Sequence, residues 1–147
     1  MKKKKIQNII ILSIAIIIIG AIIAYNYSVD TTKQKGLQFG NELSQIENEL
    51  SEIQNKFYSE KTKWAEGDIS KEELLKFYEE HIDNFQQTIS KYDKLTPPEL
   101  FQSSVILLKM SAETQLESDL QFIDWVKTGD EGSKIRSNTL IQEAYEY

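Results

Sequence analysis

The chain has 147 residues, of which 17 are Lys or Arg and 23 are Asp or Glu, so it carries a net charge of −6 at pH 7. It contains no cysteine, which excludes disulfides, thiolate metal sites and an anchor made by a lipidated cysteine. The acidic balance argues against nucleic acid as a partner, because an acidic surface repels phosphate backbones.

An apolar segment follows directly after four lysines at the start of the chain. Residues 6–27 contain no charged side chain, and 11 of these 22 residues are isoleucine. As a helix, this segment would be about 33 Å long, against a hydrocarbon core of about 30 Å. It therefore predicts a transmembrane helix that contacts membrane lipid.

The same segment lacks the features of two kinds of removable leader peptide. A secretory signal peptide has a shorter apolar core and a small-x-small cleavage site, but Ala21 and Ala24 are one residue too far apart for that spacing. A pilin-type leader would have a small residue before the cut and an acidic residue after it, and neither is present. We expect the segment to stay in place as a signal-anchor.

Charges on either side of the span set its expected orientation. Lysines 2–5 precede it, and Tyr25 and Tyr27 at its other end suit the boundary between lipid and water. We therefore expect the N-terminus in the cytoplasm and the C-terminal domain outside the cell membrane. Beyond the four lysines, the chain holds 13 basic and 23 acidic residues, a net charge of −10. The expected organisation is a cytoplasmic basic tail (1–5), the transmembrane helix (6–27), a juxtamembrane joint with glycines (28–36) and an extracytoplasmic helical bundle (37–147).

Apolar residues in the outer domain recur at helical spacing. The first run steps by three and four residues, as in a coiled-coil seam: Phe39, Leu43, Ile46, Leu50, Ile53, Phe57 and Trp64. The second comprises Leu75, Tyr78, Ile82, Phe85, Ile89 and Tyr92, and the third comprises Phe101, Val105, Leu108, Ala112, Leu116, Leu120 and Ile123. A shorter fourth segment starts at about Glu131. With short connections, these runs predict an all-α fold, an antiparallel up-down bundle of three to four helices with a short last helix.

Two segments share the sequence pattern of a helix start. In ISKEEL (69–74) and LTPPEL (95–100), a Ser or Thr precedes a Glu by three residues. This spacing predicts capping boxes formed by Ser70 with Glu73 and by Thr96 with Glu99.

Prolines and a glycine mark further helix ends. Pro97 and Pro98 are expected at the first two helical positions, where a missing N–H has no cost. Gly129 is expected to end the third helix in a left-handed conformation. The cap of the fourth segment stays open between Thr128 and Asp130.

Residue patterns for catalysis or metal binding were sought in this acidic helical chain. A di-iron bundle needs paired Glu-x-x-His motifs, but the single histidine, His81, has Tyr78 three residues before it. His81 is therefore expected at the edge of the core. We expect no cofactor, no bound metal and no enzymatic activity.

The C-terminal stretch beginning LTPPELFQSSVILLKM resembles small, uncharacterised prokaryotic single-span membrane proteins with an extracytoplasmic helical domain. In that group, a similar Leu-x-Pro-Pro turn opens a long helix. The resemblance covers about the last 55 residues. It implies the fold and the topology, and it implies no activity.

These patterns favour a non-catalytic accessory subunit that is held at the outer face of the membrane and interacts with a protein partner or with itself. The alternative is an extracytoplasmic helical bundle that senses a ligand or binds a solute. Because the last helix is short, the half of the bundle nearest the membrane is expected to lack one wall. The residues expected to border this partner groove are Phe39, Leu43, Ile46, Phe101, Val105 and Leu108.

Overall fold

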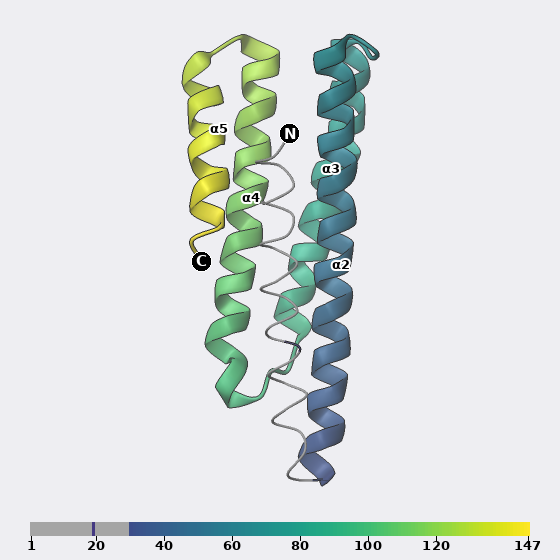
Figure 1. Ribbon diagram of the computed structural model, residues 1–147, viewed down its shortest axis with the longest axis vertical. Coiled ribbons are helices and arrows are strands. Elements are labelled where there is room, and N and C mark those ends of the chain that lie inside the picture. The colour runs from purple at the N-terminus through teal and green to yellow at the C-terminus, as the bar shows by residue number, and fades with distance from the viewer. Residues whose placement is uncertain (1–18, 20–29) are drawn as a thin grey trace.

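The computed structural model describes Ile19 and residues 30–147. This part of the chain is entirely helical, with four α-helices, two 3₁₀ helices and no strand (Figure 1). In chain order, the elements are α2 (Asp30–Glu66), α3 (Lys71–Ser90), η2 (Lys91–Lys94), η3 (Glu99–Phe101), α4 (Gln102–Thr128) and α5 (Glu131–Ala144).

Successive helices run antiparallel and form two hairpins, α2–α3 and α4–α5 (Figure 1). The hairpins are joined through α3 and α4, which pack against each other. Glycines with positive φ lie in both hairpin turns, Gly67 at 82° and Gly129 at 76°. The predicted helical bundle is confirmed, including the short last helix of 14 residues.

The predicted caps at Ser70 and Gly129 are confirmed. The Glu73 backbone N–H donates to Ser70 Oγ at 3.1 Å, and the Ser70 N–H donates to Glu73 Oε2 at 2.7 Å, which completes the capping box. Gly129 ends α4 in the left-handed region. Asp130 is the N-cap of α5, since its carboxylate accepts a hydrogen bond from the Gly132 N–H at 3.0 Å.

The predicted start of the third helix is wrong. Residues 95–98 are not helical, and α4 begins at Gln102 after the single 3₁₀ turn of η3. Pro98 has a ψ of 151°, which is an extended conformation. The reason is that a proline disfavours the α conformation of the residue before it, so Pro97 cannot readily be helical ahead of Pro98. Thr96 is therefore not an N-cap.

The predicted N-terminal segments lie mostly outside the described residues. This holds for the basic tail (1–5) and, apart from Ile19, for the transmembrane helix (6–27). Between residue 30 and residue 147, no helix combines the length and the apolar character that crossing a membrane requires.

The predicted juxtamembrane joint is helical from Asp30 onward, because α2 already begins there. Gly36 and Gly40 lie inside this helix, where each costs about 1 kcal/mol relative to alanine. Phe39 and Leu43 on the same helix are each only 1% exposed, and burying such side chains contributes about 1.5–3 kcal/mol each. Packing therefore overrides the local preference of the glycines.

The core has two parts. Toward the end at which α2 begins, aliphatic and aromatic residues of all the longer elements except α5 pack together around Phe39, Leu43, Phe85 and Val105. Toward the other end, rings dominate. Phe57 is fully buried and lies edge-on to Phe122 at 5.9 Å between ring centroids. The rings of Trp64 and Trp125 are also edge-on, at 5.8 Å.

Candidate functional site

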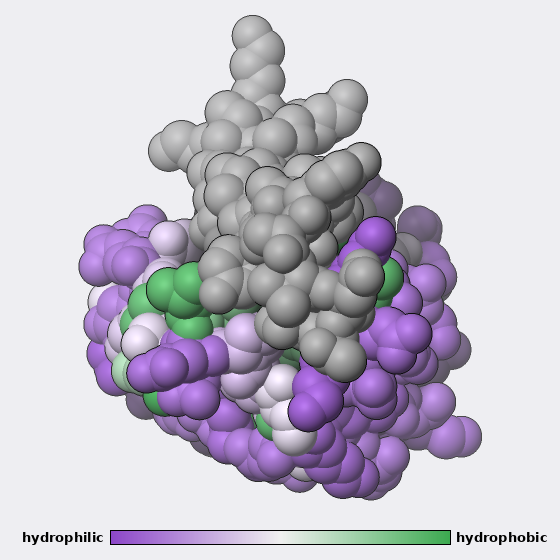
Figure 2. Space-filling model, turned by 90° about the horizontal axis from the view of Figure 1, so that it is seen from below, coloured by the Kyte–Doolittle hydropathy of each residue, from purple (hydrophilic) through white to green (hydrophobic). Residues whose placement is uncertain are grey.

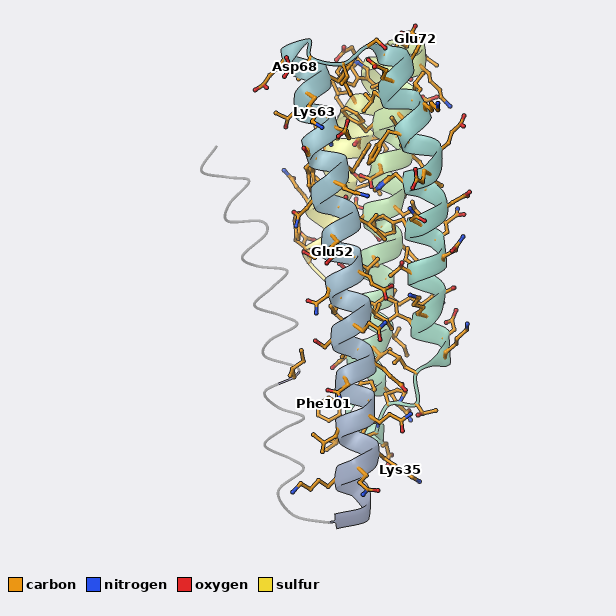
Figure 3. All side chains as sticks on the ribbon, turned by 90° about the vertical axis from the view of Figure 1, so that its right-hand side faces the viewer. Lys35, Glu52, Lys63, Asp68, Glu72 and Phe101 are labelled. Carbon is orange, nitrogen blue, oxygen red and sulfur yellow. The ribbon has the colours of Figure 1, made fainter. Side chains whose placement is uncertain are left out.

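The six residues of the predicted partner groove lie together, but in the core. Phe39, Leu43, Ile46 and Val105 are buried, and Phe101 and Leu108 pack against them. The rings of Phe39 and Phe101 are 6.1 Å apart, and Figure 3 places Phe101 beside α2 between the levels of Lys35 and Glu52. These residues close the helices on one another, because η3 turns Phe101 toward α2. The six together do not border one open groove.

The short last helix does leave a gap, at a different place. The Ser111 hydroxyl donates to the carbonyl oxygen of Ala144 at 2.6 Å, so α5 covers α4 only from about Ser111 to Thr128. Beside the end of α5, a cavity of about 240 Å³ opens between α2 and α4. We call it the cleft. Leu108 is the one residue of the predicted groove that lines it. Among its other lining residues are Glu47, Leu50, Gln54, Tyr58, Leu107 and Tyr145.

A half-buried carboxyl group, that of Glu47, lies at one end of the cleft. The Tyr92 hydroxyl donates a hydrogen bond to Glu47 Oε1. Burial raises the pKa of Glu47, and the bond from Tyr92 opposes that rise. Burial also raises the pKa of Tyr92, as does the neighbouring Glu47 carboxylate. The tyrosine therefore stays a neutral donor, and Glu47 Oε1 accepts its hydrogen bond.

Tyrosines close the other end of the cleft. The Tyr58 and Tyr145 side chains are hydrogen-bonded to each other and tie α2 to the end of α5. Burial raises the pKa of both phenols. Because Ser111 holds the Ala144 carbonyl from α4, the end of α5 is fixed from two sides, and this fixes the shape of the cleft.

Gln54 connects the cleft to a polar group deep in the core. Its Nε2 donates to Asp119 Oδ2 at 3.2 Å, and His81 Nε2 lies 2.7 Å from the same oxygen. The three side chains come from α2, α3 and α4, and all are buried. Gln54 Oε1 has no hydrogen-bond partner among the described residues. The Gln54 residue lines the cleft, while this oxygen itself is buried.

His81 lies in the core and not at its edge, which corrects the sequence expectation. The residue is 3% exposed, and its ring is stacked on Phe57 with 4.2 Å between centroids. Burial is the largest influence on Asp119 and raises its pKa, while the bond from His81 lowers it. In the part of the chain that the structure describes, no three His, Cys, Asp or Glu side chains are grouped to hold a metal ion.

Sequence reasoning did not find Glu47, Gln54 or Asp119. Each is a polar residue inside a run of apolar residues at helical spacing, and that position was the available signal. Asp119, for example, lies between Leu116 and Ile123 on the buried side of α4. Its partners could not be read from the sequence, because they depend on how far α4 is shifted along α2 and α3.

An apolar strip on α4 and the turn before it forms a second candidate surface. We define the α4 strip as Leu100, Ile106, Leu107 and Met110, which are 67%, 59%, 42% and 38% exposed. Leu107 lies one helical turn before Ser111, on the side that α5 covers further along. In Figure 2, which views the end where α2 begins, hydrophobic surface is exposed within a mostly hydrophilic face.

Comparison of the chain with protein-family models, with curated proteins and with solved structures finds no match. The resemblance to small single-span membrane proteins thus stays a prediction.

Proposed function

We propose that this chain is a non-catalytic accessory subunit, anchored in the cell membrane by residues 6–27, whose helical domain binds a protein partner outside the cytoplasm. The α4 strip carries this proposal. Soluble domains seldom keep contiguous apolar surface bare, and such patches are typical of protein interfaces. Leu107 continues the face of α4 that α5 covers, so a helix of a partner would pack on Leu107 and extend over the neighbouring Ile106 and Met110.

The position of the strip agrees with an anchored protein. Leu100 and Leu107 belong to the half of the bundle where α2 begins, and α2 begins three residues after the predicted span ends. A partner held in the same membrane would meet this half first. Anchoring both proteins also raises their local concentration, so that a small interface suffices.

The non-catalytic part of the proposal rests on where the reactive side chains lie. The chain has a single histidine, and its side chain and that of Asp119 are 1% and 3% exposed. A general base must come within hydrogen-bond reach of its substrate, and this pair is enclosed by Phe57, Phe85 and Tyr78.

The test compares two matched substitutions in the full chain, purified in a mild detergent. Ile106→Lys places a charge in the α4 strip, and Ile135→Lys places the same charge on α5, at an isoleucine that is 65% exposed. We expect the wild type and Ile135→Lys to purify with a stoichiometric membrane partner or as a defined oligomer, and Ile106→Lys to lose it while keeping its helical content. Equal behaviour of both variants would contradict the proposal.

A second candidate function is solute binding or ligand sensing, and the cleft favours it. A concave site with an apolar lining and a few convergent polar groups is the usual form of a small-molecule site. The Glu47 carboxyl group, which lines the cleft and accepts a hydrogen bond from Tyr92, is one such polar group. Binding of any small solute to the full chain in titration calorimetry, lost when Leu108→Trp fills the cleft, tests this candidate.

A further inference from the structure

Several hydrogen-bond donors that line the cleft are engaged within the protein. The Tyr92 hydroxyl donates to Glu47, and the Ser111 hydroxyl donates to the Ala144 carbonyl. Gln115 Nε2 in turn donates to Ser111 Oγ at 3.3 Å, and the Gln54 amide nitrogen donates to Asp119. An anion, which needs donors, would compete with the protein's own acceptors for these four groups.

Acceptors remain available instead. The Glu47 carboxyl group accepts one bond from Tyr92, whereas a carboxylate offers about four acceptor positions. The cleft therefore favours a ligand that donates hydrogen bonds, and its one acidic side chain favours a ligand with positive charge.

The rest of the lining suits an organic cation with an apolar body. Four tyrosines, Tyr58, Tyr92, Tyr145 and Tyr147, line the cleft, and aromatic rings attract cations through their negative faces. Leucine and alanine side chains supply the apolar floor, and no Lys, Arg or His is among the described residues that line the cavity. Nothing in this lining would repel a cation.

We propose that the cleft is a binding site for a small organic amine, with the ammonium group at Glu47 and the apolar body between Leu50, Leu107 and the tyrosines. This inference rests on the second proposed function and names its class of ligand. Glu47 and Gln54 are seven residues apart on α2, a rise of about 10 Å. A ligand that reached from Glu47 to the Gln54 side chain would therefore span about that length. The cavity of about 240 Å³ is smaller than the about 300–1,000 Å³ of sites for drug-sized molecules, so the ligand is small.

The test uses three probes that share one body and differ in charge: 4-phenylbutylamine, 4-phenylbutanol and 4-phenylbutyrate. Each is titrated into the full chain in mild detergent at pH 7 and followed by calorimetry, with empty micelles as the blank. We expect the amine to bind at least about tenfold more tightly than the alcohol, because a hydrogen bond between charged groups is stronger than one to a neutral donor. The carboxylate is expected not to bind.

Two matched variants distinguish the effect of the Glu47 charge in the cleft on amine affinity from that of a charge on the protein surface. Glu47→Gln keeps an acceptor for Tyr92 and removes the charge inside the cleft, and we expect it to lose about tenfold or more of the amine affinity. Glu52→Gln removes an exposed carboxylate from the same helix, outside the cleft, and should leave the affinity unchanged. The unfolding curve of each variant checks that the bundle is intact. Tyr92→Phe is a second cleft variant. It keeps the Glu47 carboxylate, so the amine should still bind.

The outcomes distinguish the inference from the function on which it rests. Amine selectivity that depends on Glu47 supports both. If the alcohol binds as tightly as the amine, or if Glu47→Gln and Glu52→Gln behave alike, the site binds solutes but is not a cation site, and the inference is overturned. If none of the three probes binds above the micelle blank, the inference and the solute-binding candidate are both overturned.

Discussion

His81 Nε2 lies 2.7 Å from Asp119 Oδ2 in the interior of the bundle, and the two side chains are 1% and 3% exposed. Because Gln54 Nε2 donates to the same oxygen, one carboxyl group joins α2, α3 and α4. A polar group of this kind specifies how the helices are aligned, since any shift along their axes leaves a buried donor or the carboxyl group without its partner.

The first prediction concerns this carboxyl group. Asp119→Ala should destabilise the bundle by about 3–5 kcal/mol, because it leaves His81 and Gln54 buried without an acceptor. Asp119→Asn keeps an acceptor oxygen and should cost only about 1 kcal/mol. Urea unfolding of the full chain in mild detergent, followed by the fluorescence of Trp64 and Trp125, measures both. Asp83→Ala, at an exposed position of α3, is the control and should stay within about 0.5 kcal/mol of the wild type. A similarly small change for Asp119→Ala would contradict the structural role.

The helices and their buried faces could be predicted from the sequence, because apolar spacing is a local property. Leu50, Phe85, Ile89, Tyr92 and Leu116 were all predicted in apolar runs at helical spacing, and all lie in the core. The cleft could not be predicted. It depends on where α5 ends against α4, which is set by the contact between Ser111 and Ala144, and on the turn of η3 that brings Phe101 inward.

Sequence patterns also failed to distinguish two segments that look nearly identical, ISKEEL (69–74) and LTPPEL (95–100). Ser70 forms a full capping box, whereas Thr96 lies in an extended connection. The difference comes from the second proline: a single proline at the first helical position is favourable, but Pro98 keeps Pro97 out of the helical conformation. A pattern that ignores this pair of neighbours predicts a cap that does not form.

The second prediction follows from that comparison. Ser70→Ala should lower the free energy of unfolding by about 1 kcal/mol, within the range of about 0.5–2 kcal/mol for a lost N-cap. Thr96→Ala should change it by less than about 0.5 kcal/mol, because an exposed residue outside a helix cap contributes little. Parallel urea unfolding curves of the two variants decide the matter, and an equal loss in both would show that α4 starts earlier than Gln102.

The third prediction concerns the anchor. We expect residues 6–27 to remain attached and the helical domain to lie outside the membrane, because four lysines precede the span and no small-x-small site follows it. Intact-mass measurement of the purified protein should show the full chain of 147 residues, and protease added to spheroplasts should digest the domain. A mature N-terminus near residue 25, or a domain that only detergent makes accessible to protease, would contradict this topology.

The fourth prediction concerns the pH dependence of stability at Glu47. Its pKa in the folded protein is raised above 4.5, chiefly by burial. A carboxyl group with a raised folded-state pKa contributes stability that is complete below its unfolded pKa and is lost as the pH rises through its folded pKa. Glu47→Gln does not titrate and keeps an acceptor for the Tyr92 hydroxyl. The free energy of unfolding of this variant should therefore rise relative to that of the wild type as the pH is raised from about 4.5 toward 7.

Glu49 provides the matched control with the opposite sign. Its pKa is lowered, mainly by the hydrogen bond from Lys91, so it contributes stability that is present above its unfolded pKa and lost as the pH falls through its folded pKa. Glu49→Gln should therefore lose stability relative to the wild type as the pH rises from about 3 to 5. Urea unfolding at intervals of half a pH unit measures the free energy of unfolding of Glu47→Gln and of Glu49→Gln, each relative to the wild type. The two residues lie within one turn of α2. An effect of pH on the helix or on the detergent would therefore change the stability of both variants, relative to the wild type, in the same direction. Opposite changes can come only from the local environments of Glu47 in the cleft and of Glu49 beside Lys91.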